Sequence, residues 1–227
     1  MMARLQKLFR TLRRRPTASR VGLRRRTLAQ PPKDWGREDE LRAILVEDPN
    51  DIAAFNELVD LVRTRIREAQ EHEWHVDNLR GDVPEDPRDA AERAANDAVW
   101  ALSEELAGNP RAWHPLIELA RLSIHEDRDG AMRRLTTAVE RDHSGVALAE
   151  GIKTLREVDA PADALALGVG HWRPKEHTPE AGKQLIKAAI EAGRLAEAKR
   201  HFEALAEHPD TGYVGRVRAE LEGLLGD

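Results

Sequence analysis

The clearest pattern of hydrophobic and polar positions lies between Pro179 and Thr211. Gly193 divides this stretch into two segments, and it suits the left-handed position that ends a helix. Pro209 ends the second segment, because a proline ring cannot continue a helical hydrogen-bond ladder. Within both segments apolar residues recur at the three- and four-residue spacing of one helical face, first at Leu185, Ile186 and Ala189 and then at Ala198, Phe202 and Leu205. The pattern predicts two amphipathic helices joined by a tight turn.

The same pattern returns upstream, 34 residues earlier from Gly145 and a further 35 residues earlier from Pro110. A fourth copy begins at Ile52 and is split, with its second half ending near Ala107. We expect both helices of this split copy to be longer than usual and to meet at 81–84, a Gly-Asp-Val-Pro cluster typical of turns. Two helices cannot bury both of their apolar faces alone, so neighbouring copies are needed to complete a core.

This period, with large and small residues at matching positions, resembles the tetratricopeptide repeat (TPR) over residues 51–211. The resemblance implies an all-α superhelix of TPR-like hairpins, about four in number, one of them with a long hairpin extension. Short helices are expected to cover both ends of a repeat domain spanning 37–227. The first should run from Arg37 to Val46, with Leu41, Ile44 and Leu45 facing inward, and the last should face the array with Tyr213, Val217, Leu221 and Leu224.

TPR proteins usually bind a peptide or a partner helix in a concave groove lined by the first helix of each repeat. The resemblance places certain positions of each first helix in this groove, and many of them are basic here. Charge on a concave wall concentrates a ligand of opposite sign, so the predicted partner is a peptide or helix of another protein, with an acidic segment as one candidate. The alternative is that these charges only keep a short array soluble. The predicted partner-binding residues are Arg111, His114, Arg121, Lys153, Arg156, Lys183 and Lys187.

Charge divides the chain into two regions. Residues 1–33 hold eleven basic residues and no acidic one, and because the whole chain carries −5, residues 34–227 carry −16. We interpret residues 1–36 as a basic arm and linker, disordered or forming a short amphipathic helix that Pro16 ends. The cations expected to contact an anionic surface are Arg4, Lys7, Arg10, Arg13, Arg14, Arg15, Arg24, Arg25 and Arg26. The apolar face of the arm would consist of Leu5, Leu8, Phe9 and Leu12.

Several functions are compatible with this arm. A run of like charges can be a disordered tail with no dedicated partner. An apolar stripe flanked by arginine suits the anionic surface of a membrane. Arginines alone suffice for contact with RNA or a ribosome, although no element for reading a base sequence is evident. A mitochondrial presequence is a further alternative, and a clasp onto the acidic body is compatible with each of these.

Catalytic and metal-binding motifs are scarce. The chain has no cysteine, which excludes disulfides and thiolate zinc sites. It has no glycine-rich phosphate loop and no nucleophile elbow. His72 and His75 stand beside glutamates, but their spacing differs from the zinc-protease motif. We therefore predict no enzyme activity, no metal and no cofactor. Trp74, near the tip of the long hairpin, is either a core residue or a contact residue.

These observations predict a non-catalytic adaptor or complex subunit that binds a protein partner through the groove or the long hairpin, while its arm contacts an anionic membrane. The alternative is an accessory factor bound to RNA or a ribosome through the arm. No apolar run approaches the roughly 20 residues that span a bilayer. The expected location is the cytoplasm, including the inner face of the membrane, and the Ala-, Arg- and Asp-rich composition suggests a bacterium.

Overall fold

The computed structural model describes residues 34–78 and 87–225, and this part of the chain is all-helical. Its helices are α2 (Asp34–Glu47), α3 (Ile52–Asn78), α4 (Pro87–Ala107), α5 (His114–Ser123), α6 (Arg128–Arg141), α7 (Val146–Glu157), α8 (Pro161–His171), α9 (Pro179–Glu191), α10 (Leu195–Ala204), the short 3₁₀ helix η1 (Leu205–Glu207) and α11 (Thr211–Leu225). The predicted turn at 81–84 and the arm 1–33 lie outside the described residues. None of the helices in the described ranges is both long enough and apolar enough to cross a membrane.

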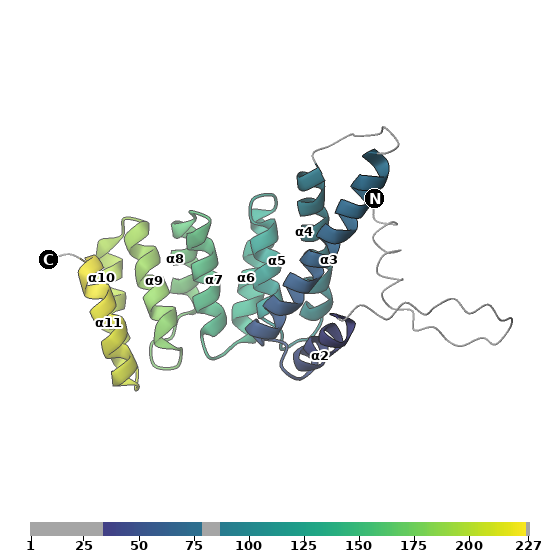
Figure 1. Ribbon diagram of the computed structural model, residues 1–227. Coiled ribbons are helices and arrows are strands. Elements are labelled where there is room, and N and C mark those ends of the chain that lie inside the picture. The colour runs from purple at the N-terminus through teal and green to yellow at the C-terminus, as the bar shows by residue number, and fades with distance from the viewer. Residues whose placement is uncertain (1–33, 79–86, 226–227) are drawn as a thin grey trace. The chain divides into compact units, whose positions relative to one another are not determined.

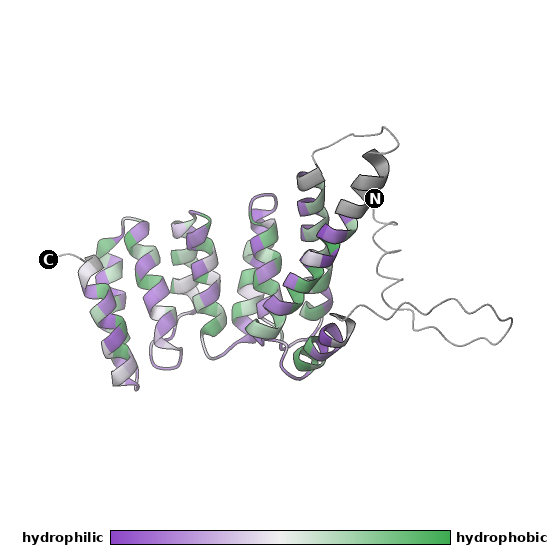
Figure 2. Ribbon diagram, viewed as in Figure 1, coloured by the Kyte–Doolittle hydropathy of each residue, from purple (hydrophilic) through white to green (hydrophobic). Residues whose placement is uncertain are grey.

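Consecutive helices form pairs that stand side by side (Figure 1). The pairs are α3 with α4, α5 with α6, α7 with α8, and α9 with α10. The first helices also pack on one another, because α7 contacts both α5 and α9, and α11 packs on α9. Each helix carries hydrophobic and hydrophilic residues in alternation (Figure 2), as expected when one stripe is buried.

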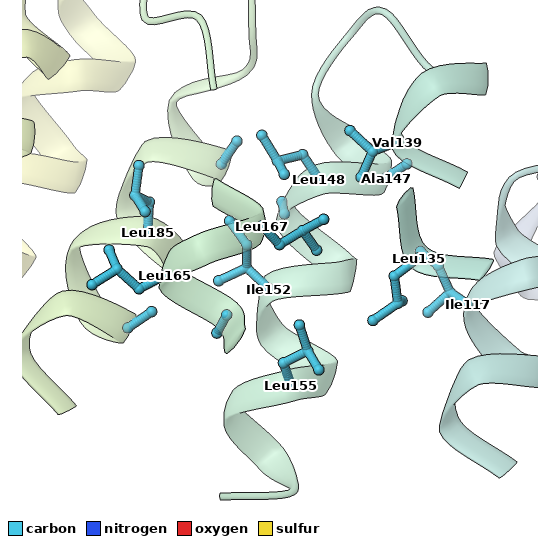
Figure 3. Packing of buried hydrophobic residues seen from close by; sticks show 14 of the residues in the cluster. Ile117, Leu135, Val139, Ala147, Leu148, Ile152, Leu155, Leu165, Leu167 and Leu185 are labelled. Atoms are coloured by element: carbon cyan, nitrogen blue, oxygen red, sulfur yellow. The ribbon is translucent and has the colours of Figure 1, made fainter. Parts of the chain in front are cut away.

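One hydrophobic cluster runs from α5 to α11. At its centre Leu148 and Ile152 of α7 lie between α8 and α9, close to Leu167 and Leu185 (Figure 3). These four side chains are at most 4% exposed. Burying a leucine or isoleucine stabilises the fold by about 1.5–3 kcal/mol. The repeating apolar positions therefore form one continuous core.

The second helix of the Gly145 copy contains Gly168 where a larger apolar residue would be typical, and the packing explains why. A Cβ atom at this position would lie only 2.5 Å from Leu185 Cδ1 and 3.1 Å from Ile152 Cδ1. The missing side chain therefore lets α8 approach α7 and α9 closely. In the next hairpin, Gly193 has a φ of +71° and ends α9, as its position in the sequence predicts.

Helices α2, α3 and α4 have a smaller cluster of their own, which includes Leu41, Leu45 and Phe55. The prediction that Ile44 faces inward with Leu41 and Leu45 is wrong, because Ile44 is 39% exposed. Helix α2 packs mainly on α3, and this contact buries the narrow stripe of residues spaced four apart. Helix α2 also begins at Asp34, three residues before the predicted start.

The predicted last helix is present as α11, which covers the final hairpin. Its buried residues are Val214, Val217 and Leu221, whereas Tyr213 is only partly buried. The buried stripe is thus centred slightly away from the predicted one. The side chain of Leu224 lies outside the described residues, as do those of Trp74, His72 and His75.

Candidate functional site: the first-helix face

The predicted partner-binding residues belong to α5, α7 and α9 or to the segment just before α5. We call the side of α5, α7, α9 and α11 that carries their charged residues the first-helix face. Because α5 packs on α7, α7 on α9 and α9 on α11, charged groups far apart in the sequence become neighbours there. The contacts of each predicted cation decide what this face presents to a partner.

At the α9–α11 end, one carboxylate holds two lysines. Lys183 Nζ lies 2.8 Å from Glu220 Oε2, and Lys187 Nζ lies 2.9 Å from Glu220 Oε1. Hydrogen bonds from both lysines lower the pKa of Glu220. Burial acts to lower the pKa of Lys183, but its contacts with Glu220 and Glu180 outweigh burial and raise it. Both lysines are therefore already engaged by Glu220.

Between α7 and α9, Arg156 makes a bidentate ion pair with Glu191, with its Nε 2.8 Å from Oε2. Its third hydrogen bond goes to the side-chain oxygen of Gln184. The amide nitrogen of Gln184 donates in turn to Glu180 Oε1 at 2.8 Å. This chain of contacts uses most of the donors of Arg156, and bidentate pairing of this kind fixes the guanidinium in one orientation.

Between α5 and α7, Arg121 lies 2.6 Å from Glu118 and 3.9 Å from Glu157, and it donates to Thr154 Oγ1 at 3.1 Å. Lys153 lies between two carboxylates, 3.8 Å from Glu150 and 4.0 Å from Glu157. Burial raises the pKa of Glu118, although the charge of Arg121 acts in the opposite direction.

His114 differs from the other predicted partner-binding residues because it is a core residue, only 5% exposed. Its ring packs edge-on against Phe55 and Trp113, with centroid distances of 4.8 and 5.6 Å. Neither ring nitrogen has a hydrogen-bond partner in the described part of the chain. Burial, and then the charge of Arg121, lower the pKa of His114 to about 4. The prediction that His114 lines an open binding surface is wrong, because its ring is buried in the core and is neutral at pH 7.

Arg111 is exposed and lies in the loop before α5, where its guanidinium donates to the carbonyl of Glu47 at 3.4 Å. The same loop is held by Asn50, a residue that the sequence patterns did not single out. The side-chain oxygen of Asn50 accepts hydrogen bonds from the backbone N–H groups of Trp113 at 2.7 Å and His114 at 3.2 Å. Asn50 thereby satisfies the start of a helix that has no cap of its own.

The structure therefore brings Arg121, Lys153, Arg156, Lys183 and Lys187 onto one face and places a carboxylate within 4.0 Å of each. Between α7 and α11 the cations are the less accessible partners. The side chains of Arg156, Lys183 and Lys187 are 16–22% exposed, whereas those of Glu191 and Glu220 are 41% and 49% exposed. In the described part of the chain, these five cations of the first-helix face therefore belong to a network of paired charges.

The sequence spacing alone indicates some of the carboxylates in this network. Glu118 with Arg121, Glu150 with Lys153 and Glu180 with Lys183 each stand three residues apart, a spacing that allows contact on one helix. Glu191 and Glu220 were missed, because their partners lie more than 30 residues away in the sequence. In the described ranges no three histidine and carboxylate groups gather in a way that would hold a metal ion. The arm residues named above lie outside these ranges.

No protein-family model matches this chain, and no curated protein or solved structure is significantly similar to it.

Proposed function

We propose that this chain is a non-catalytic adaptor or complex subunit, built as a TPR-like array, which binds a segment of another protein on its first-helix face. The observation that carries the proposal is the alignment of α5, α7, α9 and α11, which places their charged residues on one face. Helix pairs that repeat in this way typically offer an extended binding surface.

The pairing of charges favours a partner that brings its own hydrogen-bonding groups. An acidic segment has to compete with Glu191 and Glu220, which already occupy Arg156, Lys183 and Lys187. A peptide or helix with both donors and acceptors can hydrogen-bond to the cations and to the carboxylates of this network. Such a ligand can bind while most of the ion pairs stay in place. Charged surfaces of this kind contribute more to specificity and association rate than to affinity.

The arm gives the second part of the proposal. Its eleven basic residues, with no acidic residue before Asp34, support contact with an anionic surface. We place this contact at the inner face of a membrane, with the repeat domain in the cytoplasm. The same charge supports the alternative, binding to RNA or a ribosome.

Affinity capture with the full-length protein tests the first part. The test variant reverses Lys183 and Lys187 to glutamate, and the control variant reverses Lys199 and Arg200, which are exposed on α10. We expect the test variant to lose partners that the control keeps, with both variants retaining their helical circular dichroism. Identical partner sets for the wild type and both variants would contradict binding at the first-helix face.

Vesicle and RNA binding separate the two roles of the arm. Replacing Leu5, Leu8, Phe9 and Leu12 with serine should abolish binding to anionic vesicles and leave RNA binding intact, because only insertion into lipid needs the apolar stripe. Retained vesicle binding, or equal loss of both activities, would count against the membrane role.

A further inference from the structure

The predicted cations of the first-helix face form ion pairs, whereas two arginines on α6 lack a carboxylate at close ion-pair distance in the described ranges. Arg133 is exposed on α6 and forms no ion pair with any residue in the described ranges. Its neighbour Arg134 lies 3.8 Å from Asp127, a long contact beside the close pairs described above. Arg133 is therefore an exposed cation of α6 without a carboxylate partner in the described ranges.

These two arginines line a depression of about 190 Å³ together with Leu116, Gly130 and Thr137. Leu116 and Gly130 are buried and form its apolar part. The depression has room for an ion of phosphate size with a small group attached. The hydroxyl of Thr137 donates to the carbonyl of Arg133 at 2.9 Å, so the guanidinium groups are the donors available to a ligand.

The guanidinium of Arg134 is held in place from two sides. Its Cζ atom lies 4.9 Å from the ring centroid of Trp100 on α4, a cation–π contact. Its Nη1 donates to Ser123 Oγ at 3.1 Å. A positioned guanidinium loses little freedom when it binds an anion. The carboxylate that lies near Arg134 in the described part of the chain is that of Asp127, with Oδ2 3.8 Å from Nη1 and with Oδ1 accepting the backbone N–H of Gly130 at 2.8 Å.

We propose that this depression binds a phosphate group, through the guanidinium groups of Arg133 and Arg134. Two arginines that line one depression suit a dianion with several acceptor oxygens, and arginine pairs with phosphate through charge-assisted hydrogen bonds. Such clusters commonly recognise phosphorylated ligands. The site lies between α5 and α6, with Trp100 of α4 against Arg134, and the proposal does not depend on partner binding at the first-helix face.

Calorimetric titration of the full-length protein at constant ionic strength tests the proposal, with inorganic phosphate, phosphoserine and malonate as the probes. We expect phosphate or phosphoserine to bind, and Arg133→Gln to weaken that binding about tenfold, the usual effect of losing one charge-assisted hydrogen bond. The control is Arg200→Gln, which changes an exposed arginine on α10 and should bind as the wild type does. The basic arm is the same in all three proteins, so the difference between them reports on α6.

Arg134→Gln should weaken binding at least as much, but it also removes the contact with Trp100. Arg133→Gln therefore decides the outcome, because Arg133 is exposed and its loss leaves the core intact. Tighter binding of phosphoserine than of inorganic phosphate would place the group on a partner chain, and the reverse order would indicate free phosphate. No binding of either probe, equal binding by Arg133→Gln and the wild type, or equal affinity for malonate would overturn the proposal.

Discussion

The hairpins from α5 to α11 and the segment from α2 to α4 achieve stability in different ways. The former share one hydrophobic cluster in which every hairpin buries apolar residues against the next. The latter has a separate, smaller cluster around Phe55 and Leu58. The long helices α3 and α4 extend beyond the neighbouring hairpin (Figure 1), and the residues of this cluster lie at the other end of the pair.

The two regions meet through apolar packing, since Trp100 and Ala107 of α4 pack against the larger cluster, and through directed polar contacts. Asn50 reaches the first amides of α5, and Arg141 Nη1 donates to the carbonyls of Ala107, Asn109 and Ala112 at 2.8–3.1 Å. His114 packs between Phe55 of one cluster and Trp113 of the other. The repeated hairpins share one apolar core, whereas the atypical hairpin keeps a core of its own and adds several directed hydrogen bonds to its apolar contacts with α5. Such a junction is more sensitive to single polar substitutions and to pH.

Removing a central apolar side chain should have the largest effect. Leu185→Ala creates a cavity beside Gly168, which has no side chain of its own to fill the space, and should cost about 2–5 kcal/mol of unfolding free energy. The measurement is chemical denaturation followed by circular dichroism. Val169→Ala, which truncates a side chain 56% exposed on α8, is the control. A loss below about 1 kcal/mol for Leu185→Ala would show that the shared core is loosely packed.

Acidification should act on the junction next. The pKa of His114 is lowered from 6.5 to about 4 in the folded chain, so the unfolded chain binds more protons between these values. The free energy of unfolding is not reduced by this residue above pH 6.5. It falls as pH drops toward 4, by up to about 3 kcal/mol, because the buried ring resists protonation. The charged group that acts on His114 is Arg121, which also acts on Glu118 together with Arg63 of α3.

Because other groups also titrate in this range, the measured quantity is the difference between the wild type and His114→Leu. Unfolding free energies at pH 7 and pH 4.5 should diverge less for the variant, which lacks the titrating ring. Parallel pH profiles for the two proteins would refute the assignment of acid sensitivity to His114.

Loss of the Asn50 side chain that caps the start of α5 should have an intermediate effect. Asn50→Ala leaves the N–H groups of Trp113 and His114 without an acceptor and should cost about 1–2 kcal/mol. Hydrogen exchange at the start of α5 should accelerate, while exchange in α9 stays unchanged. Asn56→Ala, an exposed asparagine on α3, provides the matched comparison. Uniform acceleration along the chain would argue against a separate junction.

The ion-pair network should contribute least. Glu220→Gln weakens contacts with Lys183 and Lys187, but both partners are partly solvated, so the expected loss is about 0.5 kcal/mol at low salt and less at high salt. Thermal denaturation at two salt concentrations measures it, with Glu222→Gln as the control. A loss that persists in high salt would mean that the network is less solvated than its exposure indicates.

The sequence alone predicts most of the helices. The apolar period locates both helices of the last three hairpins, and Gly193 and Pro209 mark turns that the structure contains. It predicts the orientation of the flanking helices less well. Ile44 is exposed and Val214 is buried, because the buried stripe depends on which neighbours a helix has and from which side they approach.

The candidate site divides in the same way. Local spacing determines which cations lie on the first helices and pairs some of them with acids one turn away. Only the tertiary structure decided that Glu220 holds Lys183 and Lys187, that Glu191 holds Arg156, and that His114 is buried. These contacts depend on how helices 28–35 residues apart rotate and approach one another, because a hydrogen-bonded ion pair forms only when donor and acceptor lie about 3 Å apart. A pattern of residue types along the chain carries no such distances.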